Sequence, residues 1–239
     1  MTDNPLVQQT ATWVEQKLTG ENSGHDWEHA RAVWNNAKTI GNTESTANML
    51  VVELAALLHD INDWKEDTLD DEKSAAMAKD WLTKIGVEAA TIDQILDIIK
   101  KVSYFGPNFI EESMDINGQI VRDADRLEAM GAVAWDRTVK FGQAKGIPDI
   151  NEHLPNLGLT DDQYKNYMRP ENSAVNHVFE KFLLLKDRLV TKKGKEIGLQ
   201  RHLELISVVR QYLNSILGKG IVPDSRIKEY LSMLDTESR

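Results

Sequence analysis

The sequence predicts an all-α protein with a single domain. Along successive segments, apolar residues recur three or four positions apart, which is the spacing of one face of a helix. Glycine, proline and polar clusters separate these segments, and none of them shows the alternation of apolar and polar residues that is typical of a strand. The chain has 239 residues, of which 41% are hydrophobic, so one large domain with a substantial core is expected.

The first half of the chain is organised around an apolar block, residues 49–58. Every residue of this block except Glu53 is apolar, and a helix that is apolar all round belongs in a core. This core helix is expected to start near residues 43–45, because Gly41 and Asn42 end the helix before it. Helices with one apolar face are expected over residues 6–19, 25–40, 71–85 and 88–102.

The second half alternates helices with irregular segments. Residues 119–141 predict another buried helix, in which Gly131 permits close packing. Glycine and proline predict a loop over residues 103–118, which could act as a lid, and an irregular excursion over residues 142–170 on the outside of the domain. Further helices are expected over residues 176–189, over residues 195–217 and after Pro223.

Composition limits the classes of partner. The net charge of −10 disfavours nucleic acid, because binding a phosphate backbone needs a broad basic surface, but a small anionic substrate can still bind where a metal and a few cations reverse the local field. The absence of cysteine excludes disulfides, thiolate metal sites and cysteine nucleophiles. The N-terminus lacks the pattern of a signal peptide, and no stretch reaches about 18 unbroken apolar residues, so a cytoplasmic location without a membrane partner is expected. The oligomeric state is not indicated.

The apolar core helix leads directly into His59 and Asp60. An imidazole and a carboxylate at the end of a buried helix are costly unless a partner compensates them. A divalent metal is one such partner. The alternative is that the two side chains form a hydrogen-bonded pair that caps the helix.

Two other places carry polar side chains that need a similar explanation. His25 and His29 would lie on one face if the helix includes both, and could then approach one site, although a capping Asp26 with two half-exposed histidines explains the same pattern. Asp125 lies among small apolar residues of the predicted helix 119–141, where it is either bound to something or paired with Arg126.

A local excess of basic residues lies between residues 181 and 201, where the only acids are Asp187 and Glu196. This segment binds substrate phosphate or forms a solvated face, and the sequence does not decide between the two. The basic residues are Lys181, Lys186, Arg188, Lys192, Lys193, Lys195 and Arg201.

Taken together in order, these segments resemble the HD-domain metal-dependent phosphohydrolases. The segment HDWEH at residues 25–29 resembles an HDxxH motif of one bacterial subgroup, and LLHDINDWK at 57–65 resembles its LLHDxxDxK. DADRLEAMGAVAWDRT at 123–138 resembles DADRLDAxGAxGxxRT, and HVFEKFLLLKDRLVTKKGKEIGLQRH at 177–202 is similar to the subgroup's late stretch. The resemblance implies an HD phosphohydrolase domain over residues 1–217, with residues 218–239 as a short helical extension packed on it.

The resemblance also implies a site. It assigns one divalent metal ion, which could be Mn, Mg, Co or Ni, to four ligands: His29, His59, Asp60 and Asp125. Four other residues are candidates for proton transfer, ligand orientation or phosphate binding next to the metal: His25, Asp26, Asp63 and Lys65. Weaker candidates for contact with substrate phosphates are Arg126, Lys181, Lys192, Lys195 and Arg201.

The implied reaction is hydrolysis of a phosphate or phosphoanhydride bond of a nucleotide, and some members of the subgroup convert a nucleoside triphosphate into a monophosphate and pyrophosphate. The alternative is a metal-containing nucleotide sensor with little turnover. The chain departs from its relatives at residues 103–105, where Ser-Tyr-Phe replaces a segment that often begins with histidine. It also lacks the GYP motif of the cyclic-dinucleotide branch and the extra histidines of dinuclear members, which favours one metal over a di-iron oxygenase.

Overall fold

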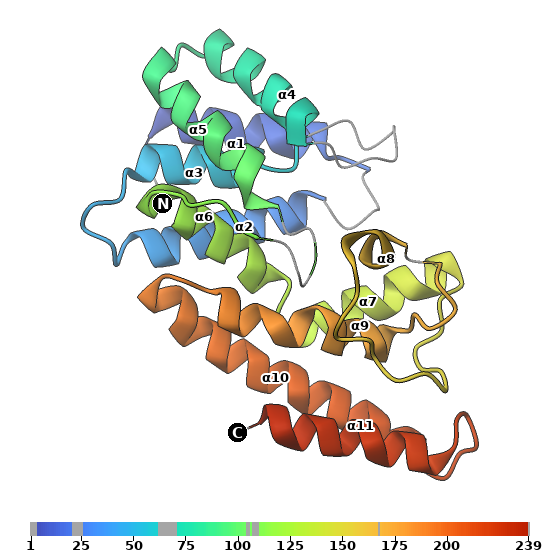
Figure 1. The fold of residues 1–239 in the computed structure, drawn as a ribbon. Coiled ribbons are helices and arrows are strands. Elements are labelled where there is room, and N and C mark those ends of the chain that lie inside the picture. The colour runs from blue at the N-terminus through green and yellow to red at the C-terminus, as the bar shows by residue number, and fades with distance from the viewer. Residues whose placement is uncertain are drawn as a thin grey trace. The chain divides into compact units, whose positions relative to one another are not determined.

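The fold is all-α, as the sequence predicts. The computed structural model describes residues 4–20, 26–61, 71–103, 106, 110–166 and 168–238, and within them every regular element is a helix (Figure 1). The α-helices of unit 1, defined below, are α1 (Pro5–Lys17), α2 (Trp27–Gly41), α3 (Met49–Leu58), α4 (Asp71–Lys84), α5 (Ala89–Val102) and α6 (Ile116–Glu128). The later elements are α7 (Ala132–Lys145), α8 (Asp161–Lys165), α9 (Ala174–Glu180), the 3-10 helix η2 (Phe182–Arg188), α10 (Lys192–Ile216) and α11 (Asp224–Glu237).

The chain divides into two compact units. Unit 1 contains Met1–Ser103, Glu111–Glu128 and Val190–Gly194. Unit 2 contains the remaining segments, which are Tyr104–Ile110, Ala129–Leu189 and Lys195–Arg239. The predicted division into a domain at 1–217 and an extension at 218–239 stays a prediction.

Unit 1 is built around α3. Helices α1, α2, α5 and α6 all pack against α3, and residues 51–58 are all buried, so the apolar block is the predicted core helix. It starts at Met49, after its N-cap Asn48, and not near residues 43–45 as expected, because the Asn48 side chain accepts from the backbone N–H groups of the first turn. Glu53, the one charged residue in the block, accepts a hydrogen bond of 2.7 Å from the indole Nε1 of Trp34. Burial removes the hydrogen bonds that the Glu53 carboxylate would make with water. The bond from Trp34 replaces one of them and so lowers the cost of burying the carboxylate.

Asp123 on α6 holds the segment Val190–Gly194 within unit 1. Its side chain is fully buried, and its carboxylate accepts hydrogen bonds from the backbone N–H groups of Val190 (3.1 Å) and Thr191 (2.8 Å) and from the Thr191 hydroxyl (2.7 Å). The backbone of Gly194 approaches so closely that an added Cβ would lie 2.5 Å from Asp123 Oδ2. We refer to this arrangement of Asp123, Thr191 and Gly194 as the Asp123 clamp.

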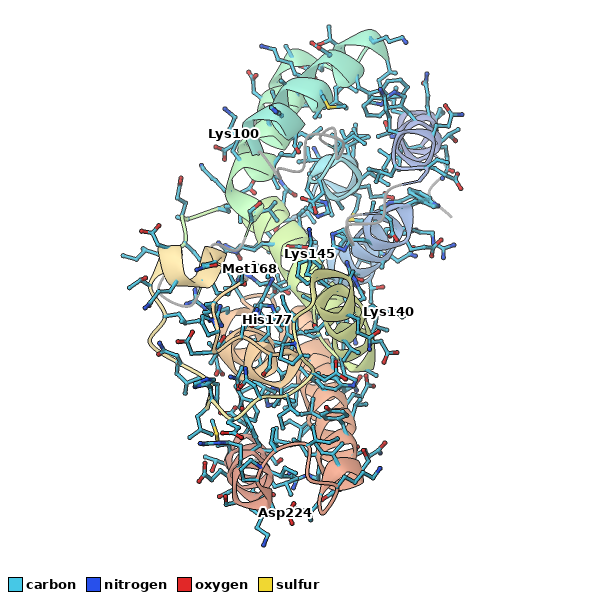
Figure 2. The ribbon with its side chains drawn as sticks, turned by 90° about the vertical axis from the view of Figure 1, so that its right-hand side faces the viewer. Lys100, Lys140, Lys145, Met168, His177 and Asp224 are labelled. Atoms are coloured by element: carbon cyan, nitrogen blue, oxygen red, sulfur yellow. The ribbon has the colours of Figure 1, made fainter. Side chains whose placement is uncertain are left out.

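Unit 2 has its own core around α9, α10 and α11. Tyr230 on α11 is fully buried, and its hydroxyl lies within hydrogen-bonding distance of the His153 carbonyl and the Asn176 side chain. Asp224, labelled in Figure 2, begins α11 and accepts a hydrogen bond of 2.9 Å from the N–H of Gly218.

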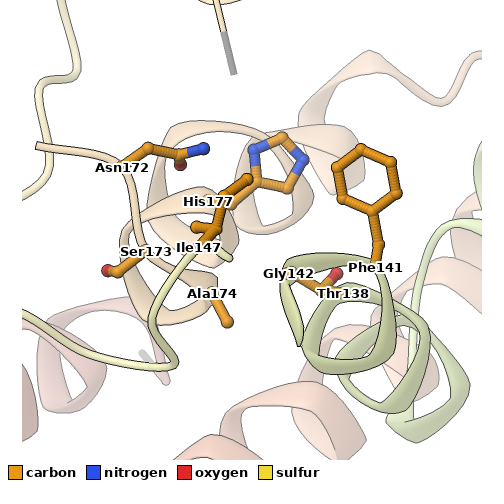
Figure 3. Close-up of a pocket in the computed structure, with 8 residues that line it drawn as sticks. All are labelled: Thr138, Phe141, Gly142, Ile147, Asn172, Ser173, Ala174 and His177. Atoms are coloured by element: carbon orange, nitrogen blue, oxygen red, sulfur yellow. The ribbon is translucent and has the colours of Figure 1, made fainter. Parts of the chain in front are cut away.

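A small cavity of about 30 Å³ in unit 2 is lined on one side by the imidazole of His177 (Figure 3). It has room for a water molecule. Burial, together with the nearby charges of Lys181 and Arg169, lowers the pKa of His177 to about 3, so this imidazole is neutral at ordinary pH. The cavity is lined by Thr138, Phe141, Gly142, Ile147, Asn172, Ser173, Ala174 and His177.

The predicted single helix over residues 119–141 is wrong. The chain forms α6 and α7 instead, and Gly131 between them has φ 86° and ψ −169°. Only glycine adopts this backbone region readily, so the helix cannot continue through Gly131.

The predicted helix over residues 176–189 also differs from the structure. Here α9 ends at Glu180, and the leucine-rich segment that follows is the 3-10 helix η2. The irregular excursion predicted over residues 142–170 is partly helical, because α7 extends to Lys145 and α8 lies within the excursion. In the described parts of the chain, no helix combines the length and apolarity needed to cross a membrane.

Candidate metal centre

Four polar side chains of unit 1 converge on one point. The Nε2 atoms of His29 and His59 are 3.3 Å apart. Asp60 Oδ2 lies 3.3 Å from His29 Nε2 and 3.2 Å from His59 Nε2. Asp125 Oδ1 lies 3.7 Å from each of the two nitrogens. The four predicted metal ligands are therefore neighbours in space, although they come from three parts of the sequence.

Helix ends place three of these residues. Asp26 caps α2, and its carboxylate accepts a hydrogen bond of 2.9 Å from the N–H of His29, which fixes His29 in the first turn of the helix. His59 is the C-cap residue of the buried helix α3, so His59 and Asp60 emerge where the backbone leaves the core. Asp125 comes from α6, which packs against both α2 and α3.

The outer nitrogen of each imidazole has an acceptor. His59 Nδ1 lies 2.9 Å from the carbonyl oxygen of Ala56, and His29 Nδ1 lies 2.9 Å from a carboxylate oxygen of Glu128. Carbonyl and carboxylate oxygens accept hydrogen bonds, so each Nδ1 carries a proton and donates it to its acceptor. The two Nε2 atoms then face each other beside two carboxylates, an arrangement that a bound cation would stabilise.

The pKa values of these groups are shifted by their mutual charges and hydrogen bonds. Burial alone would lower the pKa of His29, but hydrogen bonds with Asp60 and Glu128 outweigh burial and raise it to about 9. Burial would also lower the pKa of His59, but the charge of Asp60 and the hydrogen bond to Asp125 raise it well above 6.5. Burial would raise the pKa of Asp125, whereas the hydrogen bond and charge of His59 lower it. In the absence of a metal, protons are thus drawn into the cluster.

The donor set fits a divalent ion. Metal–ligand distances near 2.1 Å place adjacent ligands of an octahedral ion about 3 Å apart. The separations of 3.2–3.7 Å between each imidazole nitrogen and its neighbours are close to this value. Nitrogen and oxygen ligands without sulfur suit Mn²⁺, Co²⁺ and Ni²⁺ as well as Mg²⁺. His29, His59 and Asp125 together satisfy the spacing of a metal-binding group, and Asp60 lies within the same cluster.

The structure places only some of the other predicted site residues. His25, Asp63 and Lys65 lie outside the described residues. Asp26 is the helix cap described above, and its role in proton transfer or ligand orientation stays a prediction. Arg126 is 2% exposed, and its guanidinium forms a 2.7 Å ion pair with Glu111, so a substrate could reach it only by displacing that carboxylate.

The basic residues of the late stretch fall in both units. Lys192 belongs to unit 1, and Lys181, Lys195 and Arg201 belong to unit 2. The side chains of Lys192 and Lys195 are exposed, and those of Lys181 and Arg201 are half-buried. Their contact with substrate stays a prediction.

Two acidic residues near the site were not predicted from the sequence. Glu111 pairs with both Arg122 and Arg126, and Glu128 contacts His29. A signal for Glu128 was present, because it follows Asp125 by three residues and therefore lies on the same face of α6. No comparable signal points to Glu111, which precedes the helix.

Comparison with known proteins agrees with this geometry. The model of the HD domain matches residues 26–130, a range that includes all four cluster residues. The uncharacterized protein YpgQ of Bacillus subtilis is 38% identical over 89% of this chain and 94% of its own length. A crystal structure of YpgQ in complex with ADP has a TM-score of 0.66 and 33% identity, and covers 89% of this chain and 96% of that chain.

Two further crystal structures are similar. An HD-superfamily hydrolase from Bacillus thuringiensis has a TM-score of 0.66 and 31% identity, over 87% of this chain and 95% of its own. A protein from Lactobacillus plantarum has a TM-score of 0.75 and 26% identity, over 90% of this chain and 98% of its own. The buried His–Asp cluster, the matching domain and these relatives lead to one conclusion: this chain is a member of the HD superfamily of hydrolases.

Proposed function

We propose that this chain is a divalent-metal-dependent phosphohydrolase that cleaves a phosphate or phosphoanhydride bond of a nucleotide. The observation that carries the proposal is the pair of facing imidazole nitrogens, 3.3 Å apart and flanked by Asp60 and Asp125. Two imidazoles and two carboxylates leave further positions of an octahedral ion for water and a phosphate oxygen. The two histidines favour Mn²⁺-like ions over Mg²⁺ as the tightest binders.

The residues have separate roles in this proposal. His29, His59, Asp60 and Asp125 hold the ion, which when bound polarises a phosphoryl oxygen and lowers the pKa of water. The backbone cap from Asp26 fixes the position of His29. Asp63 is the proposed general base, and Lys65 the proposed phosphate contact, because they follow His59 by four and six residues. His25 and Asp26 are the alternative proton carriers, and Arg126, Lys181, Lys192, Lys195 and Arg201 are proposed to bind further phosphate groups.

Three findings support a nucleotide as the substrate. A nucleoside diphosphate is bound in the crystal structure of the relative YpgQ. The negative net charge of this chain disfavours a polymeric nucleic acid but leaves room for a small anion at a metal. The local run of basic residues at 181–201 offers cations for additional phosphates. A nucleoside triphosphate cleaved to monophosphate and pyrophosphate is the finer form of this proposal.

The direct test is hydrolysis by the purified full-length protein after its metal has been removed and replaced. Ribo- and deoxyribonucleotides are incubated with Mn²⁺, Mg²⁺, Co²⁺ or Ni²⁺, and phosphate and pyrophosphate are measured separately. Activity that needs the ion and disappears in both His59→Ala and Asp125→Ala supports the proposal. Nucleotide binding with metal but without turnover would instead establish the sensor function.

The roles of Asp63 and Lys65 have their own test. Asp63→Asn and Lys65→Ala are expected to keep the metal and the thermal stability, because neither residue is assigned to the ion, but to lose turnover. A positioned base supplies about 10²–10⁴ in rate, so the loss should exceed tenfold, or about 1.4 kcal/mol of barrier. If both variants retain normal kcat with metal bound, the base must be sought at His25 and Asp26.

A further inference from the structure

Glu128 lies directly behind one of the proposed metal ligands. Its carboxylate Oε2 is 2.9 Å from His29 Nδ1, and the side chains of Glu128 and His29 are only 10% and 5% exposed. Asp125 precedes Glu128 by three residues, so both project from the same face of α6. The helix thus brings one carboxylate to the inner side of His29 and another to its outer side.

The two histidines of the cluster are held in different ways. His59 donates from Nδ1 to the Ala56 carbonyl, a neutral group that the helix backbone supplies. His29 donates from Nδ1 to a carboxylate, which carries a negative charge and belongs to a side chain. A carboxylate acceptor increases the basicity of the opposite ring nitrogen more than a carbonyl does, because it stabilises positive charge that develops on the ring.

We infer that Glu128 is a positioning residue for the metal centre. It holds the ring of His29 in one orientation, keeps the proton on Nδ1 and so directs the Nε2 lone pair at the ion. It also adds a negative charge close to a site whose two carboxylates already match a divalent cation. This inference rests on the proposed metal site and assigns Glu128 no contact with the ion or with substrate.

Three substitutions separate the parts of this role. Glu128→Gln keeps an oxygen acceptor in nearly the same shape but removes the charge. Glu128→Ala removes the acceptor as well. Glu112→Gln is the matched control, because it deletes one carboxylate charge in the same unit from a side chain that is 67% exposed and 3.8 Å from Lys101.

The measurement is the dissociation constant of Mn²⁺ for the metal-stripped, full-length protein, obtained by isothermal titration calorimetry well below the unfolding temperature of each variant. Loss of such a hydrogen-bond partner typically weakens metal binding by about 10–100-fold, so this range is expected for Glu128→Ala, with a smaller loss for Glu128→Gln and none for Glu112→Gln. Thermal unfolding of the metal-free proteins is measured alongside.

The outcomes are distinct. If Glu128→Ala and Glu128→Gln bind Mn²⁺ as tightly as the wild type, the inference is overturned, whether or not their unfolding temperatures fall, because a purely structural residue would affect stability alone. If the wild type binds none of Mn²⁺, Mg²⁺, Co²⁺ and Ni²⁺, the inference and the metal site are overturned together. If the affinities follow the expected order but no nucleotide is hydrolysed, the proposed function fails and the role of Glu128 stands.

Discussion

The Asp123 clamp is expected to be a major source of stability in unit 1. Replacing Asp123 by Ala removes the acceptor of two donors of Thr191, its backbone N–H at 2.8 Å and its hydroxyl at 2.7 Å. Asp123 is fully buried and Thr191 is 4% exposed, so water cannot readily replace the lost partner. A buried donor left without an acceptor costs about 1–3 kcal/mol, so two such donors give a loss of about 2–6 kcal/mol in the free energy of unfolding.

Urea unfolding at pH 7, followed by circular dichroism at 222 nm, measures this loss. Thr191→Val removes the hydroxyl but keeps the backbone bond, and should cost about 1–2 kcal/mol. Asp97→Ala is the control, because Asp97 is 58% exposed and pairs with Lys101 on the same helix, and ion pairs exposed to solvent contribute little to stability. If Asp123→Ala is no more destabilising than Asp97→Ala, the clamp does not stabilise the unit and the reasoning fails.

Three more changes have defined outcomes. Gly131→Ala should destabilise unit 2 by about 1–3 kcal/mol in thermal or urea unfolding, because alanine must adopt φ 86° with its Cβ 3.2 Å from Glu204 Oε2. An unchanged unfolding midpoint would show that the α6–α7 connection tolerates a side chain. Trp34→Phe removes the 2.7 Å donor of the buried Glu53 and should cost about 1–3 kcal/mol, whereas wild-type stability would mean that this bond contributes nothing. The pKa of His177 is lowered to about 3 in the folded protein. Between about pH 6.5 and 3 this histidine therefore binds a proton only in the unfolded state, which favours unfolding. Its contribution to the free energy of unfolding is complete above pH 6.5 and falls by up to about 1.4 kcal/mol per pH unit below that pH. Unfolding of His177→Phe between pH 4 and 7 should lack this part of the pH dependence, and a pH profile identical to that of the wild type would contradict the burial argument.

The core helix and the four-residue cluster could be predicted from the sequence because their signals are strong. The block at 49–58 is too apolar for a surface, and polar residues at its end need compensation wherever the helix is placed. The break at Gly131 was missed because apolar residues continue at helical spacing on both sides of it. The spacing of apolar residues does not indicate that one glycine between them has a positive φ. The 3-10 form of residues 182–188 was missed for a similar reason, since consecutive leucines satisfy either kind of helix.

The partners of individual charges were the least predictable part. The sequence offered an Asp–Arg pair as one explanation of the polar residues in helix α6. In the structure, Asp123 instead binds backbone and hydroxyl groups 67 and 68 residues later, and Arg126 pairs with Glu111. Such partners depend on how distant segments pack, and helical periodicity reports only which face of a helix is buried.

Helix α6 has a consequence for how the length of this chain can vary. Within about one and a half turns, Asp123 meets Thr191, Asp125 meets the two histidines, Arg126 meets Glu111 and Glu128 meets His29. Successive residues of an α-helix are about 100° apart around its axis, so one residue inserted between Asp123 and Glu128 would turn the side chains on one side of the insertion away from their partners together. A substitution removes one of these contacts, whereas such an insertion or deletion removes several. The spacing from Asp123 to Glu128 is therefore fixed by geometry, and changes of chain length must fall outside these six residues.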